Sequence, residues 1–176
     1  MIIKIAIVYG LGGILFDPPS GERQLTQRLK ASGHKIDVGA SPYDYTASQA
    51  IHEFLRGADW KGIIGDSFGA DYAPGYARSL MPEKVDFLAG FQPSLYASDV
   101  VVNGLVMLPK NVVLAHCIYD PNWLDTGGLG AAQYDVPTGS PTKLLTTKHR
   151  GAHPDDWGTS QNMIFSQVMN LLETLK

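Results

Sequence analysis

Residues 60–69 read WKGIIGDSFG, an apolar run that passes directly into a Gly-Asp-Ser-Phe-Gly motif. The run from Trp60 to Gly65 predicts a short strand, because it is apolar and ends at a glycine. The residues from about 69 to 80 favour a helix. A buried strand followed at once by a helix is the building unit of α/β proteins, so this stretch indicates that fold class.

The same alternation extends in both directions along the chain. Short apolar runs predict strands, and apolar residues at helical spacing predict helices. The predicted strands cover residues 2–9, 35–39, 60–65, 85–91, 111–119 and 143–149, and the predicted helices cover about 20–32, 51–58, 69–80 and 164–175. Residues 92–110 are expected to form a small flap at most, and residues 120–141 a long loop.

Apolar strands without polar alternation are typical of a parallel sheet that is buried on both faces. We therefore predict a three-layer α/β sandwich, with an about six-stranded, mostly parallel sheet and helices on both faces. A chain of 176 residues has room for one such domain, which we expect to span residues 1–176.

The chain carries little charge and much glycine. Charged residues make up 18%, the formal net charge is −3, and 19 of the 176 residues are glycine. This composition gives no electrostatic footprint for nucleic acid and excludes a disordered charged chain, so no nucleic-acid partner is expected. The single cysteine, Cys117, excludes an internal disulfide and a cysteine-rich zinc site, and is expected to pack as a small apolar residue.

The N-terminal residues 2–9 weakly mimic a signal peptide, with one early positive charge within an apolar run. The run passes into glycines without a small-residue cleavage site, so we interpret it as the first strand. No stretch reaches the ~18 apolar residues of a membrane span. We expect a cytoplasmic protein without a membrane span.

The motif at residues 65–69 is of the G-x-S-x-G type and lies between a predicted strand and a predicted helix. In that position a sharp turn presents the serine hydroxyl at the edge of the sheet, and the two glycines let the strand and the helix approach each other. Ser67 is therefore the candidate nucleophile. The alternative is an ordinary strand-to-helix turn in which Ser67 caps the helix.

A serine hydroxyl needs a base that a third group orients. Asp120 follows a predicted strand and His153 follows the last one, so the chain order of serine, acid and histidine fits this type of fold. Asp120 is expected to orient His153, which would take the serine proton. Asp125 is the alternative acid, and His149, inside the predicted last strand, is the alternative base.

An oxyanion hole requires backbone N–H groups that are already in place. Phe68, after the candidate nucleophile, is expected to supply one and Leu11 the other, with Gly10 or Gly12 as alternatives to Leu11. Gly10 and Gly12 also suggest a phosphate loop. However, the G-x-G-x-x-G pattern fails at Leu15 and no G-K-[ST] follows, so no cofactor is expected.

A metal site is a weaker alternative. It would use His149 and His153 with Asp155 or Asp156, but it lacks the helical H-E-x-x-H frame and leaves the serine motif unexplained. We therefore expect no metal. His116 lies in an apolar run and is expected to be a hydrogen-bonded core histidine.

At these residues the chain resembles the α/β-hydrolase superfamily, and in particular its small, lid-poor members. These include compact serine esterases, cutinase-like enzymes and lysophospholipase-like carboxylesterases. The matching features are the Tyr-Gly-Leu-Gly-Gly loop at residues 9–13, the motif at residues 65–69, Asp120 and His153. The resemblance implies the strand order second-first-third-fourth-fifth-sixth. Tyr9 departs from the histidine that many relatives carry there, and Pro74 should kink or shorten its helix.

These observations predict a serine hydrolase that cleaves a small-molecule carboxylic ester through an acyl-enzyme. Thioesterase, amidase or acyltransferase activity would use the same residues. Two further classes are a non-catalytic relative that binds a ligand, and a flavodoxin-like module with a phosphate at residues 10–13.

Overall fold

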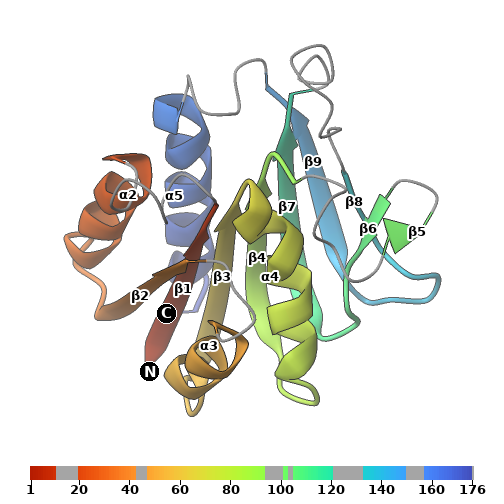
Figure 1. The fold of residues 1–176 in the computed structure, drawn as a ribbon. Coiled ribbons are helices and arrows are strands. Elements are labelled where there is room, and N and C mark those ends of the chain that lie inside the picture. Colours follow the sequence, from red (N-terminus) through yellow and green to blue (C-terminus); the bar gives the residue numbers. More distant parts are fainter. Residues whose placement is uncertain are drawn as a thin grey trace.

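A six-stranded sheet forms the centre of the computed structural model, which describes residues 1–10, 20–42, 47–93, 101–102, 105–120, 133–149 and 157–175 (Figure 1). The strands of this sheet are β1 (Ile3–Tyr9), β2 (Ile36–Pro42), β3 (Trp60–Asp66), β4 (Val85–Phe91), β7 (Val112–Tyr119) and β9 (Lys143–Lys148). They lie in the order β2-β1-β3-β4-β7-β9, and every neighbouring pair is parallel.

Helices cover both faces of this sheet. The helices α2 (Ser20–Lys30) and α5 (Trp157–Glu173) lie on one face, and α3 (Ala47–Leu55) and α4 (Phe68–Ser79) lie on the other (Figure 1). The predicted three-layer α/β sandwich is confirmed. The strand order also agrees with the order that the resemblance implies, with the second strand at one edge and the first beside the third.

Two apolar cores lie between the sheet and its helices, one on each face. Ile63 and Leu88 belong to the core under α3 and α4, whereas Ile64 and Phe87 belong to the core under α2 and α5. All seven residues of β3 are buried. Each fully buried large aliphatic or aromatic side chain stabilises the fold by roughly 1.5–3 kcal/mol. Because both faces of the sheet are covered, the central strands show no regular alternation of apolar and polar residues.

A second, three-stranded sheet lies beside α4. It consists of β5 (Val101–Val102), β6 (Leu105–Met107) and β8 (Gln133–Asp135), in the order β5-β6-β8. The prediction of a long loop over residues 120–141 is therefore wrong at β8. Strands of two or three residues are too short to show a period in the sequence, and this sheet was not predicted for that reason.

Tyr134 anchors the second sheet to α4. Pro74 lies inside α4 and has no backbone N–H, so the carbonyl of Ala70, four residues earlier, lacks its usual helical donor. The Tyr134 hydroxyl donates a hydrogen bond to that carbonyl at 2.6 Å. Gly90 makes room, because a Cβ there would lie 2.0 Å from the hydroxyl oxygen. The helix therefore continues through Pro74 to Ser79 and is not shortened there.

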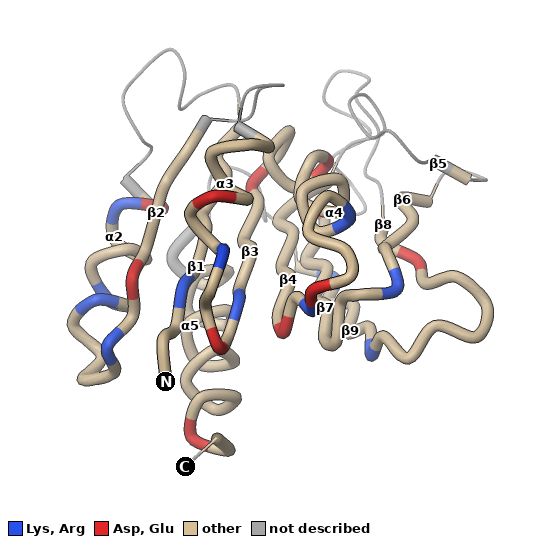
Figure 2. Tube along the Cα trace, turned by 90° about the horizontal axis from the view of Figure 1, so that it is seen from below, with Lys and Arg blue, Asp and Glu red and all other residues tan. Residues whose placement is uncertain are grey.

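Charged side chains are spread over the described surface. Figure 2 shows Lys and Arg interspersed with Asp and Glu over the described part of the chain, seen from below. Within the described ranges, no helix is both long enough and apolar enough to cross a membrane. The apolar N-terminal run is strand β1, paired with β2 and β3, as predicted.

We expect Tyr134→Phe to lower the free energy of unfolding by about 1–3 kcal/mol, because the Ala70 carbonyl would stay buried without a donor. Equilibrium urea denaturation measures this loss.

Pro74→Ala supplies the matched background for that measurement. It restores a backbone N–H that can bond to the Ala70 carbonyl, so Tyr134→Phe should destabilise the Pro74→Ala protein less than the wild type. Equal losses in the two backgrounds would contradict this account of the anchor.

Candidate active site

Ser67 forms the turn between β3 and α4, at the edge where the carboxyl ends of the parallel strands meet. Its backbone has φ 52° and ψ −123°, a conformation that strains a residue other than glycine by roughly 1–3 kcal/mol. The Ser67 N–H donates to the carbonyl of Phe91, at the end of β4, at 2.9 Å. The Ser67 carbonyl accepts the N–H of Ala70 at 2.9 Å. These two bonds hold the strained turn between the strand and the helix.

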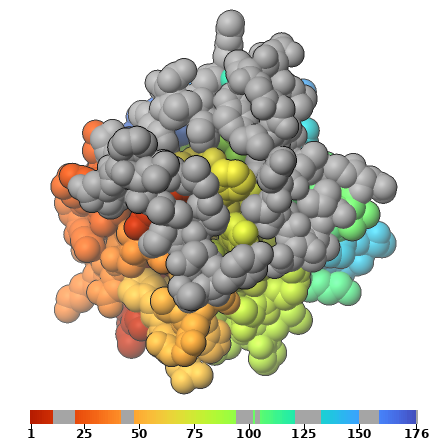
Figure 3. Space-filling view, in the orientation of Figure 1, coloured from red at the N-terminus to blue at the C-terminus, as the bar shows by residue number. Residues whose placement is uncertain are grey.

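The Ser67 side chain does not serve the helix that it precedes. Ser67 occupies the N-cap position of α4, but its hydroxyl makes no capping hydrogen bond. The alternative interpretation of Ser67 as an ordinary cap is therefore wrong. Both Ser67 and Phe68 are partly exposed, and part of the yellow segment that includes α4 is visible in the space-filling view (Figure 3).

Three glycines make room for this turn. A Cβ at Gly65 would lie 2.4 Å from the carbonyl oxygen of Gly69, and a Cβ at Gly69 would lie 2.1 Å from that of Val8. A Cβ at Gly10 would lie 2.8 Å from Ser67 Cβ and 3.2 Å from Ser67 Oγ. The close approach expected from the two motif glycines is thus present, and Gly10 brings the end of β1 beside the serine.

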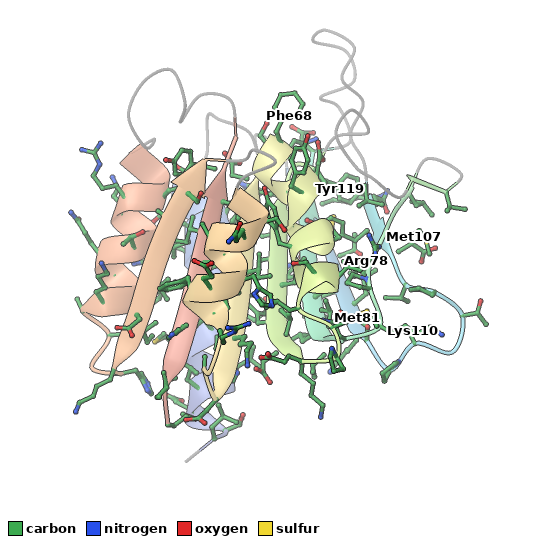
Figure 4. The ribbon with its side chains drawn as sticks, turned by 60° about the horizontal axis from the view of Figure 1, so that its bottom comes forward. Phe68, Arg78, Met81, Met107, Lys110 and Tyr119 are labelled. Atoms are coloured by element: carbon green, nitrogen blue, oxygen red, sulfur yellow. The ribbon has the colours of Figure 1, made fainter. Side chains whose placement is uncertain are left out.

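Phe68, an expected oxyanion donor, is the first residue of α4 and lies at the upper end of that helix in Figure 4. The N–H groups of the first turn of a helix carry the positive end of the helix dipole. The backbone beside Ser67 therefore favours a negatively charged oxygen. The other expected donor, Leu11, and its alternative Gly12 lie outside the described residues.

Asp120 is the first residue after β7 and is 7% exposed. Its N–H donates to Oε1 of Gln92 at 2.6 Å. One strand, β4, separates β3 from β7, so the two strand ends are about 10 Å apart. The fold therefore brings the expected nucleophile and the expected acid to the same edge of the sheet.

The last strand brings a histidine to this edge as well. His149 was expected inside the strand, but it is the first residue after β9, and its N–H donates to the carbonyl of Tyr119 at 2.9 Å. The alternative base thus follows the strand next to that of Asp120. The preferred base and three other candidates lie outside the described residues: His153, Asp125, Asp155 and Asp156.

Two residues in β7 behave as core residues, as predicted. The ring nitrogens of His116 lie 2.5 Å from Gln167 Oε1 and 2.8 Å from Thr147 Oγ1, and burial lowers the pKa of His116. Cys117 is buried, which raises the pKa of its thiol to about 12. Among the residues that the structure describes, no group of three or more His, Cys, Asp and Glu is placed to hold a metal ion.

A buried carboxyl pair lies directly behind the candidate nucleophile. Asp66, which precedes Ser67, is 6% exposed, and Glu22 of α2 is 1% exposed. Both carboxyl oxygens of Glu22 and Oδ1 of Asp66 are buried without a hydrogen bond of good geometry. Sequence reasoning missed Glu22, because an acidic residue in the first turn of a helix usually lies at the surface.

Burial raises the pKa of both carboxyl groups. The pKa of Glu22 rises from 4.5 to about 7, mainly through burial, and smaller opposing effects come from its own backbone and from Asp66. The pKa of Asp66 lies well above its usual range, first because of burial and then because of the nearby Glu22. The folded state therefore binds protons at these groups that the unfolded chain has already released near neutral pH.

Two hollows lie in other parts of the described surface. A cavity of about 220 Å³ is lined by residues of β1, β2 and α3, among them Ala6, Gly39 and Phe54. A second, of about 360 Å³, includes Arg78 and Lys110, which Figure 4 shows far from Phe68. Neither of these two hollows is lined by Ser67 or Asp120.

Comparison of the chain with protein-family models, with curated proteins and with solved structures finds no match. A functional assignment therefore rests on the geometry of this chain alone. The features that carry this assignment are the strained turn at Ser67, the glycines around it, and Asp120 at the end of β7.

Ser67→Gly should be more stable than Ser67→Ala by about 1–2 kcal/mol, because glycine adopts a positive φ without strain. Ser79, the last residue of α4, supplies the matched control. There Ser79→Gly should be less stable than Ser79→Ala by about 0.5–1 kcal/mol, as in an ordinary helix. Urea denaturation of the four variants measures both differences, and the same sign at both positions would contradict the strained turn.

The free energy of unfolding of the wild type should fall between pH 5 and pH 8. A carboxyl pKa that is higher in the folded state than in the unfolded state adds stability at low pH, and this stability is lost as pH rises toward the folded value of about 7. Glu22→Gln mimics the protonated acid, so its curve should fall less steeply, by about 1–3 kcal/mol over this range.

Urea denaturation at pH 5, 6, 7 and 8 measures these curves. Glu53→Gln, on the exposed surface of α3, is the control and should keep the wild-type slope. Parallel curves for the wild type and Glu22→Gln would show that the carboxyl pair does not hold this proton.

Proposed function

We propose that this chain is a serine hydrolase of the α/β-hydrolase type that cleaves a small-molecule carboxylic ester through an acyl-enzyme. The observation that carries the proposal is the conformation of Ser67 between β3 and α4. Its backbone has a φ of 52°, and its hydroxyl makes no capping hydrogen bond to α4. Strain of this kind persists where the surrounding structure enforces it, and it is concentrated at functional sites. An ordinary strand-to-helix turn needs no such conformation.

The surroundings of Ser67 support the same reaction. Gly10 lies against Ser67, so the end of β1 reaches the serine, and the residues that follow this strand supply an oxyanion donor in folds of this type. The N-terminus of α4 favours negative charge beside the same serine. A phosphate-binding module at residues 10–13 would require neither the strained serine nor Asp120 at the same edge.

The reaction uses four groups around the ester carbonyl. Ser67 Oγ bonds to the carbonyl carbon while His153 takes its proton, and the N–H groups of Phe68 and Leu11 donate to the oxyanion. His153 then gives the proton to the leaving alcohol as the ester C–O bond breaks. Water attacks the acyl-enzyme with His153 as base, which releases the acid and restores Ser67.

Asp120 orients His153 and stabilises the imidazolium that forms in each step. Its place at the end of β7 supports this role, since a buried acid there lies next to the strand that leads to His153. We also propose that the chain acts in the cytoplasm.

A fluorophosphonate probe, which reacts with activated serines, tests this proposal. The wild type should be labelled and Ser67→Ala should not. Asp120→Asn and His153→Ala should react at least about 100-fold more slowly, because the base is misoriented or absent. His149→Ala should react at close to the wild-type rate.

Gel fluorescence against time measures the labelling rates. An unlabelled wild type, or equal labelling of Ser67→Ala, would overturn the proposal. Loss of labelling in His149→Ala with normal labelling of His153→Ala would transfer the role of base to His149. A chain-length series of p-nitrophenyl esters, with matched thioesters and amides, then distinguishes the substrate classes.

A further inference from the structure

Gln92 connects the ends of β4 and β7 beside the candidate site. It is fully buried, with 0% of its surface exposed. Its N–H donates to the carbonyl of Ile118 at 2.7 Å, and its Oε1 accepts the N–H of Asp120 at 2.6 Å. The residue before it, Phe91, accepts the N–H of Ser67 at 2.9 Å. One short segment therefore contacts the backbone of both the expected nucleophile and the expected acid.

The conformation of Gln92 is as unusual as that of Ser67. Its φ is 47°, and Gln92 and Ser67 are the two residues other than glycine that have a positive φ in the described part of the chain. The backbone turns at Gln92 so that its side chain reaches the end of β7. This geometry indicates that the reach of the amide toward Asp120 is enforced by the fold.

The amide is also held at an energetic disadvantage. Gln92 Nε2 is buried and has no hydrogen-bond partner among the residues that the structure describes, which destabilises the fold. An apolar side chain of similar size would avoid this loss, but it would leave the Asp120 N–H without its acceptor. The acceptor at Oε1 is therefore the property that distinguishes glutamine from methionine at this position.

We propose that Gln92 is a positioning residue that fixes the backbone of Asp120, and hence the direction of its carboxylate, relative to Ser67. This role rests on the proposed function, since it requires Asp120 to be the acid of the triad. Gln92 acts through Asp120 and takes no part in bond making or breaking. A misdirected Asp120 no longer stabilises the imidazolium, so the pKa of the catalytic histidine falls.

The test compares Gln92→Met with Gln92→Glu in ester hydrolysis. Gln92→Met removes the acceptor, so kcat should fall about 10- to 100-fold with little change in KM. The acid limb of its kcat/KM profile should also move to lower pH. Gln92→Glu keeps an acceptor oxygen, so it should recover much of the activity. Burial favours the neutral form of this glutamic acid, so its acid limb should stay close to that of the wild type.

Asn111 offers a matched control at the opposite edge of the sheet. Its Nδ2 donates to the carbonyls of Ala77 and Glu83 at 2.6 and 2.9 Å, while its Oδ1 is buried without a partner. Asn111→Leu should lower the melting temperature, but kcat and the pH profile should match the wild type at a temperature where all variants are folded.

The outcomes separate this inference from the proposed function. If the wild type hydrolyses esters and labels at Ser67, but Gln92→Met keeps its kcat and pH profile, the positioning role fails and the hydrolase remains. If Gln92→Met does not fold, Gln92→Glu decides: a folded Gln92→Glu protein whose kcat still falls about 100-fold, although the acceptor oxygen is kept, overturns the role. If the wild type is inactive and unlabelled, both proposals fail.

Discussion

The contact between the first turn of α4 and strands β1 and β3 is the constraint on which the described structure depends. At Gly69 the helix lies so close to Val8 that no side-chain atom fits, and Gly65 meets the carbonyl of Gly69 in the same way. With helix and strand this close, the chain has only one residue in which to reverse, and Ser67 takes a positive φ to do so. The strained serine is thus a consequence of close backbone packing, which also sets the direction of its side chain.

The position of α4 also determines how the second sheet attaches. Pro74 removes the donor for the Ala70 carbonyl, one turn into the helix from Ser67, and Tyr134 replaces that donor from outside. Because the hydroxyl must pass β4 to reach it, Gly90 has no room for a side chain. The buried hydroxyl of Tyr134 therefore connects the second sheet to the helical turn that follows the candidate nucleophile.

The sequence predicted the features that depend on local pattern. Apolar strands such as Val85–Phe91 and the glycines around Ser67 could be predicted directly, because burial requires apolar residues and close backbone approach requires glycine. The strand β8 has no such local pattern, since its pairing with β6 depends on residues that are distant in the sequence. The roles of Glu22 and Gln92 could not be predicted for a similar reason. A glutamate in a first helical turn and a glutamine after a strand are ordinary until the fold buries them.

Buried polar groups of two kinds meet at this edge, and the proposed reaction explains why both are present. The proposed reaction requires a charged Asp120, which stabilises the imidazolium. Gln92 is uncharged and accepts the backbone N–H of Asp120. Asp66 lies next to the place where an oxyanion would form, and a second negative charge there would oppose the reaction. Burial beside Glu22 raises the pKa of Asp66, which favours its neutral form. The surroundings of Asp66 therefore favour the charge state in which this carboxyl would not oppose an oxyanion beside Ser67.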